Sequence, residues 1–244
     1  MGEAKLRRLP SLDWLAFGIG MGAMVLHYLW PPLLAVVALA VFAPSVLREL
    51  GIIRDADEYT LGVMRRAGFH AALAAGALIF LDHGLAVLGL YPGADMLAEP
   101  MILGSETLRK ALIWVFLISY LIQYWGARGG VARVLLGAAI MTLAPVAFLL
   151  RPGDYPWPGT LVAAACGSAG AMVALAWIVS RAPRAGGILL VSVCVAGLAA
   201  LATTGLADPR ARWGVISVML QAALIFGVTG LALLRETKTK EAEL

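Results

Sequence analysis

Long apolar stretches separated by short charged segments dominate this sequence. Hydrophobic residues make up 61% of the chain and charged residues only 14%, against about 25% charged residues in soluble domains. Such a composition leaves too few polar side chains to cover a soluble protein. A bilayer core, in contrast, requires roughly 20 apolar residues for each helix that crosses it. We therefore predict an integral membrane protein.

The apolar stretches do not alternate polar and apolar residues, which excludes the strands of a membrane barrel and leaves helices. The sequence predicts one all-α polytopic domain over residues 1–244, with about eight transmembrane helices joined by short loops. The predicted spans cover residues 14–30, 32–48, 67–90, 110–126, 132–150, 159–180, 187–206 and 213–234. Residues 235–244 are predicted to form a charged, disordered cytoplasmic tail.

The positions of the basic residues predict the orientation of these spans. Of the 19 lysines and arginines, fourteen fall on the side of the N-terminus and the remaining five on the other side. The first group is Lys5, Arg7, Arg8, Arg48, Arg54, Arg65, Arg66, Arg128, Arg133, Arg181, Arg184, Arg235, Lys238 and Lys240, and the second is Arg109, Lys110, Arg151, Arg210 and Arg212. Because basic residues accumulate on the cytoplasmic side, both termini are predicted to be cytoplasmic. The abundance of Ala, Gly, Leu and Arg favours a bacterial inner membrane.

Two external turns place Trp beside Pro, at Trp30-Pro31-Pro32 and within residues 152–159. Proline stops a helix, and tryptophan favours the headgroup region. The equivalent placement of these turns predicts two four-helix halves. A short repeated motif agrees with this prediction, since Arg66-Ala67-Gly68 opens the third span and Arg184-Ala185-Gly186 opens the seventh.

Two longer loops have patterns of their own. Residues 49–66 place acidic residues before basic ones, which suits the dipole of a helix, so the sequence predicts an amphipathic cytoplasmic helix there. This segment is interpreted either as a solvated connector or as a docking surface for a cytoplasmic partner. Residues 91–108 mix acidic and large apolar side chains, a pattern typical of a segment that lies along the membrane surface.

Ionisable residues inside a span are costly and therefore informative. His27, Asp82 and His83 all fall in the predicted outer leaflet, and two imidazoles with a carboxylate are suited to binding a transition metal or relaying a proton. Asp82 and His83 are adjacent, however, and point about 100° apart on a helix. The competing interpretation is structural: Asp82 pairs with a basic neighbour or caps a broken helix at Gly84, and His83 is a hydrogen-bonded packing residue.

A second set of polar residues lies in the fourth span. Tyr120, Gln123 and Tyr124 follow the spacing of one helix face, so they are candidates for lining a polar path. The alternative is that they form hydrogen bonds between helices. Small residues at a spacing of four, such as Ala163, Gly167 and Ala171, predict close helix packing.

Several function classes are excluded, and no cofactor is predicted. Haem ligation by His70 and His83 would require both side chains on one helix face. Their spacing instead places the two side chains about 140° apart around the helix. Retinal would need a lysine in the last span, and residues 213–234 contain none. Scattered basic residues do not form a nucleic-acid surface. The two cysteines, Cys166 and Cys194, fall at different predicted depths and are not expected to form a disulfide.

Three functional hypotheses follow. The sequence favours a non-catalytic subunit or scaffold of a larger membrane complex, whose partners are the bilayer and either another membrane protein or a second copy of the chain. The alternatives are a small transporter or channel with a polar site at His27, Asp82 and His83, and a membrane-embedded metal or redox enzyme that uses the same residues.

Overall fold

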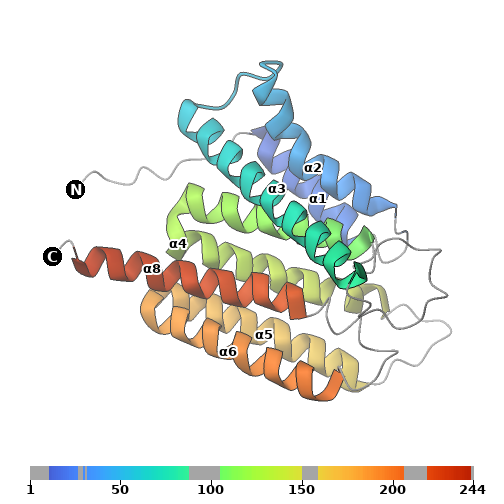
Figure 1. The fold of residues 1–244 in the computed structure, drawn as a ribbon, viewed down its shortest axis with the longest axis vertical. Helices are drawn as coiled ribbons and strands as arrows, with labels where there is room; N and C mark the ends of the chain where they lie inside the picture. The colour runs from blue at the N-terminus through green and yellow to red at the C-terminus, as the bar shows by residue number, and fades with distance from the viewer. Residues whose placement is uncertain are drawn as a thin grey trace. The chain divides into compact units, whose positions relative to one another are not determined.

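A computed structural model describes residues 11–26, 30, 32–87, 105–149, 159–205 and 219–242 of the chain. Every regular element in these residues is a helix, and none of them forms a strand. The predicted helical class is therefore confirmed for this part of the chain. The helices, shown in Figure 1, divide between a first unit, Met1–Arg65, and a second unit, Arg66–Leu244.

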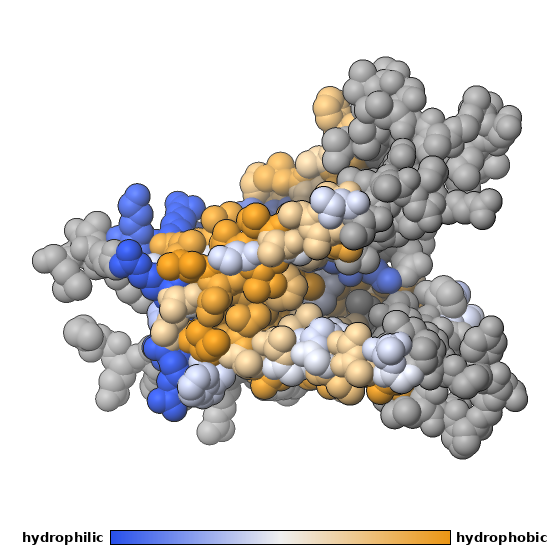
Figure 2. Space-filling view, turned by 90° about the horizontal axis from the view of Figure 1, so that it is seen from below, coloured by the Kyte–Doolittle hydropathy of each residue, from blue (hydrophilic) through white to orange (hydrophobic). Residues whose placement is uncertain are grey.

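Five helical stretches of the described residues are long and apolar enough to cross a membrane. They are Glu58–Phe80, Lys110–Ala144, Val162–Arg181, Pro183–Thr203 and Met219–Lys238. Large apolar side chains also face outward, since Phe80 is 79% exposed and Trp177 is 63% exposed. In the space-filling view of Figure 2, apolar residues cover much of the visible face. A broad apolar surface is what lipid, rather than water, requires, so these features indicate integration into a membrane.

The first unit contains two packed helices, α1 (Ser11–Leu26) and α2 (Leu33–Glu49). They approach closely where a Cβ on Gly20 would lie 3.4 Å from the Cβ of Ala40. Small residues at a crossing allow helices to pack tightly in a membrane. The pair therefore behaves as a helical hairpin held by its own apolar contacts.

The end of α2 corrects in part the prediction of an amphipathic helix at residues 49–66, because residues 51–57 are not helical whereas residues 58–66 are. Gly51 has a φ of +70°, a left-handed conformation that favours glycine. Its N–H donates to the Arg48 carbonyl, and the N–H of Ile52 donates to the Leu47 carbonyl, both at 3.0 Å. This is the Schellman arrangement, which satisfies the last carbonyls of a helix and stops it. The chain then continues as a non-helical connector.

Helix α3 (Glu58–Val87) begins immediately after this connector. The Asp57 carboxylate accepts the N–H of Thr60 at 2.8 Å, and the Asp57 carbonyl accepts the N–H of Leu61 at 3.1 Å. Asp57 is therefore the N-cap of α3, since it satisfies backbone donors of the first turn. The acidic residues expected near the start of the predicted helix thus begin α3 itself, ahead of the span predicted to begin at residue 67.

Helix α4 (Ser105–Leu149) contains a chain reversal. Gly126 has non-helical angles, with φ 76° and ψ 165°. A Cβ on Gly130 would lie 2.5 Å from the Cα of Ile122, whereas residues eight apart in a straight helix are separated by about 12 Å. The chain therefore folds back at Gly126, and Figure 1 shows the two parts of α4 side by side. The predicted break between the fourth and fifth spans is present, but as a tight turn.

The rest of the second unit packs against α4 directly or through another helix. Helix α5 (Gly159–Arg181) is followed after one residue by α6 (Pro183–Gly205). The last helical stretch contains a π-helix, η1 (Ala223–Val228), and then α8 (Thr229–Ala242). Helices α5 and α8 pack against α4, and α6 packs against α5 and α8, so the four helices share one apolar core.

The contact between α6 and α8 depends on two glycines. A Cβ on Gly187 would lie 3.1 Å from the carbonyl oxygen of Gly230, and a Cβ on Gly230 would lie 3.0 Å from the carbonyl oxygen of Gly187. Without side chains at these positions the two backbones come close together. Leu190 and Leu233 then become fully buried beside the crossing, which places the core between these helices.

Helix α8 corrects the prediction of a disordered tail at residues 235–244, because it continues to Ala242. The Glu236 carboxylate reaches across to the N–H of Ala127 at 2.9 Å. The Thr237 hydroxyl donates to the Leu234 carbonyl at 2.9 Å. A charged, polar segment of this kind is unstable alone, but here a tertiary contact to the α4 turn orders it.

Candidate functional site

The predicted site at His27, Asp82 and His83 falls outside what the structure describes. His27 is not among the described residues, and the side chains of Asp82 and His83 are not described either, although their backbone belongs to α3. Within the described part of the chain, no group of three or more His, Cys, Asp or Glu residues is arranged to hold a metal ion. The polar or metal site at these three residues stays a prediction.

The predicted polar face of the fourth span lies on the first half of α4. Tyr120 and Tyr124 are buried, and their rings stack with centroids 5.6 Å apart. Phe116 stacks on Tyr120 from the other side, with centroids 6.2 Å apart. The tyrosines thus form part of an aromatic row along α4, whereas Gln123 bonds to a different neighbour.

That neighbour, Ser119, belongs to a row of hydrogen-bonded polar side chains between α3 and α4. The Gln123 Nε2 donates to the Ser119 Oγ at 2.7 Å, and the same Oγ lies 2.7 Å from the Nδ1 of His70. We call His70, Ser119 and Gln123 the polar chain. A hydroxyl can accept and donate at once, and an imidazole carries a donor on one nitrogen and an acceptor on the other. The arrangement is therefore suited to passing a proton over a short distance.

Sequence reasoning did not find this contact. The available signal was a histidine inside an apolar stretch, which needs a hydrogen-bonding partner in a membrane. The partner, Ser119, is 49 residues away from His70. Only the tertiary structure, which places His70 of α3 beside Ser119 of α4, brings the two side chains together.

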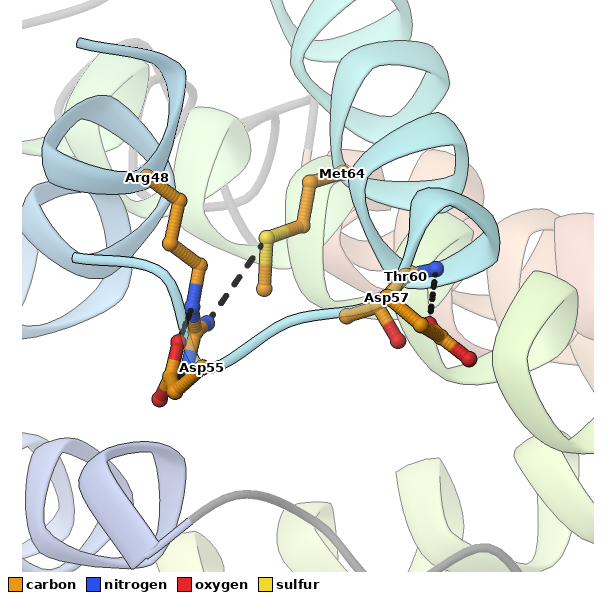
Figure 3. A network of polar contacts seen from close by, with 5 residues as sticks. All are labelled: Arg48, Asp55, Asp57, Thr60 and Met64. Atoms are coloured by element: carbon orange, nitrogen blue, oxygen red, sulfur yellow. Dashed lines mark hydrogen bonds and ion pairs between the residues drawn. The ribbon is translucent and has the colours of Figure 1, made fainter. Parts of the chain in front are cut away.

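A buried arginine holds the connector between α2 and α3. The Arg48 side chain has 0% exposure, and it binds Asp55 through Nε to Oδ1 at 2.6 Å and Nη2 to Oδ2 at 2.8 Å. Its Nη1 lies 3.7 Å from the Met64 sulfur. Figure 3 shows these side chains meeting from α2, the connector and α3. A bidentate arginine–carboxylate pair combines strength with a fixed geometry, so it sets the path of the connector.

A second pair, exposed on the surface, lies next to the first. Arg65 donates through Nε and Nη2 to the two carboxylate oxygens of Glu49. The two pairs together join the end of α2 to the connector and to the first turns of α3. Because the carboxylates already accept arginine donors, we assign these contacts a structural role in positioning the helices.

We expect the folded protein to lose stability at acid pH through these pairs. Hydrogen bonds from Arg65 hold the pKa of Glu49 below its ordinary value of 4.5, and hydrogen bonds from Arg48 hold the pKa of Asp55 below 3.8. A carboxylate whose folded pKa is lowered stabilises the fold above its unfolded pKa. That contribution is lost as the pH falls through the folded value. Thermal unfolding in detergent, measured from about pH 7 to about pH 3, should show a decline that begins near the ordinary values.

The Asp55→Asn variant is the control for this effect. It cannot gain the Asp55 proton, so it should lose less stability than the parent protein over the same acid interval. An identical decline in both proteins would contradict the assignment to Asp55.

Comparison with known proteins adds no further assignment. No protein-family model matches this chain, and neither a curated protein nor a solved structure matches it. The functional inference therefore depends on the chain's own surfaces and polar contacts.

Proposed function

We propose that this protein is a non-catalytic, multi-pass subunit or scaffold of a larger membrane complex, which docks through α1 and α2. The observation that carries the proposal is a groove of about 270 Å³ between these helices. Its walls are apolar side chains, among them Leu15, Ile19, Leu39 and Leu47. Leu15 and Leu39 are 61% and 65% exposed. The groove thus presents an open apolar surface rather than a polar site for chemistry.

The length of α2 favours a protein partner. This helix contains 17 residues, which extend only about 26 Å against a hydrocarbon core of about 30 Å. A short membrane helix is accommodated by thinning of the bilayer or by association with other helices. Side chains of a partner helix also pack against an open apolar groove more closely than mobile acyl chains do.

The proposed topology has eight passes, with both termini in the cytoplasm of a bacterial inner membrane. The unequal distribution of the 19 basic residues supports it. The turn at Gly126 supports it as well, because the 35 residues of Lys110–Ala144 would extend about 52 Å if straight, too far for one pass. Alkaline phosphatase fused after Leu244 should be inactive, since it folds to its active form only outside the cytoplasm. An active fusion would contradict the orientation.

Cross-linking in intact membranes tests the docking surface. The Leu39→Cys substitution, made in a chain with Cys166→Ala and Cys194→Ala, should give a cross-linked product larger than the single chain. The matched control is Val195→Cys on α6, because Val195 is 62% exposed, close to the 65% of Leu39. A protein that is monomeric in mild detergent and cross-links equally at both positions would refute the proposal. Cross-links that form only within a single copy of the chain would also refute the proposal.

A small transporter or channel is a second candidate, and the polar chain is the observation that favours it. His70, Ser119 and Gln123 are in hydrogen-bond contact between α3 and α4. Polar and ionisable groups within membrane spans often mark the pathways of ions and protons. Under this hypothesis, Asp82 and His83 would belong to the same path, further along α3.

Proton flux distinguishes this candidate from the first. Liposomes that contain the protein and a pH-sensitive dye should show flux that is lost in His70→Ala and in Asp82→Asn. Thr142→Ala is the control, because Thr142 lies on α4 and bonds to the Ala138 carbonyl, outside the polar chain. Flux that survives both substitutions would remove these residues from the path.

A further inference from the structure

Three segments that are far apart in sequence meet at one end of the second unit. In the turn of α4, the Ala127 N–H donates to the Glu236 Oε2 of α8 at 2.9 Å. Next to it, Arg128 Nη2 donates to the carbonyl of Ser180 near the end of α5. We call this region the basic end. It comprises residues 125–133, 177–186 and 233–238.

The basic end carries an excess of positive charge. Its exposed cations are Arg128, Arg133, Arg181, Arg184, Arg235 and Lys238. The only acidic residue in its sequence is Glu236, and that carboxylate already accepts the Ala127 N–H. Figure 2 shows hydrophilic residues gathered at the end where α5 passes into α6. The local charge therefore favours an anionic ligand.

Two of these arginines lie over tryptophan rings. The guanidinium of Arg133 is 4.3 Å from the ring centroid of Trp125, and that of Arg181 is 5.9 Å from the ring centroid of Trp177. Tryptophan favours the headgroup level of a bilayer, and a guanidinium stacked on a ring keeps N–H donors for a phosphate. These contacts hold positive charge at the depth of lipid headgroups.

The position of the basic end agrees with that depth. The apolar stretches Val162–Arg181 and Pro183–Thr203 meet here, so the arginines lie where the hydrocarbon core ends. Trp177, 63% exposed, places an apolar surface directly beside the charge of Arg181. A lipid has this combination of a charged head and an apolar body. An acidic peptide arriving from water would require only the charge.

We propose that the basic end binds the phosphate headgroup of an anionic phospholipid in the leaflet that it faces. Arg133 and Arg181 contact the headgroup, and Trp125 and Trp177 contact the lipid below it. Guanidinium groups suit this role, because they bind phosphate oxygens through two parallel N–H donors. The site is made of residues other than those of the α1–α2 groove and does not depend on the docking proposed there.

Lipid titration of the full chain in detergent tests the proposal, with bound lipid counted by native mass spectrometry. Phosphatidylglycerol should bind more tightly than phosphatidylcholine. The double variant Arg133→Gln/Arg181→Gln should bind phosphatidylglycerol about tenfold more weakly or worse. The matched control is Arg54→Gln/Arg66→Gln, which removes the same charge from exposed arginines outside the basic end. Binding by the control should be unchanged.

Three results would overturn the proposal. The first is equal weakening in the two double variants, which would indicate attraction by net charge alone. The second is phosphatidylglycerol binding no tighter than phosphatidylcholine binding in the unmodified protein, a comparison that requires no variant to fold. The third is loss of an acidic protein partner, rather than of lipid, from the Arg133→Gln/Arg181→Gln protein.

Discussion

Replacing Gly130 by alanine is expected to destabilise the second unit by about 3 kcal/mol or more, at the upper end of overpacking effects. The added Cβ would lie 2.5 Å from both the Leu121 carbonyl oxygen and the Ile122 Cα. These are backbone atoms, which cannot rotate away as a side chain can. The two parts of α4 would have to separate, and the turn at Gly126 would open. Thermal unfolding in detergent, followed by tryptophan fluorescence, measures the loss.

Gly137→Ala is the matched control on the same helix. A Cβ at Gly137 would meet no atom within 4 Å, and alanine favours a helix interior over glycine by about 0.5–1 kcal/mol. This variant should be as stable as the parent protein or slightly more stable. Similar losses in Gly130→Ala and Gly137→Ala would show that the close approach within α4 does not exist.

The Asp55→Asn substitution should have the second large effect, a loss of about 2–3 kcal/mol. Arg48 has 0% side-chain exposure and would keep its charge without the carboxylate that neutralises it. Removing one partner of a fully buried pair costs about 3–5 kcal/mol. The Asp55 side chain is 31% exposed, so water lowers that cost. Chemical unfolding in detergent measures the free energy directly.

Two further variants separate the ion pair from other effects. Glu49→Gln removes one carboxylate from the adjacent exposed pair, so its loss should be clearly smaller. The double variant Arg48→Met/Asp55→Asn leaves no buried charge. Its loss in free energy of unfolding should therefore be smaller than the sum of the losses in Arg48→Met and in Asp55→Asn. Strict additivity of the single losses would show that Arg48 and Asp55 do not act as a pair.

The helical membrane class was predictable from the sequence for a physical reason. A bilayer supplies no hydrogen bonds, so a long apolar stretch has few structural choices. The break between the fourth and fifth spans was predictable for a similar reason, since the apolar stretch is too long for one pass. Its form was not. A turn as tight as that at Gly126 requires Gly130 to sit against the backbone at Ile122, a contact between two helices.

The connector and the C-terminal segment show where charge patterns mislead. Acidic residues followed by basic ones suit a helix, yet α2 stops at Gly51 and Asp57 starts α3. The ion pair between the buried Arg48 and the partly exposed Asp55 determines the path between them. In the tail, polarity predicted disorder, but the contact from Glu236 to Ala127 stabilises α8. Local caps and a nearby ion pair therefore decided the connector, whereas a partner far away in the sequence decided the tail.

The sequence by itself determined that this protein belongs in a bilayer, because the hydropathy of a segment depends only on the residues of that segment. Its apolar stretches require a bilayer, and its basic residues predict an orientation within it. Only the tertiary structure joined His70 to Ser119 and brought the α4 turn, the α5–α6 junction and α8 to one basic end. Those contacts depend on the rotation and register of neighbouring helices. A helix that is apolar on nearly every side has a sequence pattern that encodes neither its rotation nor its register.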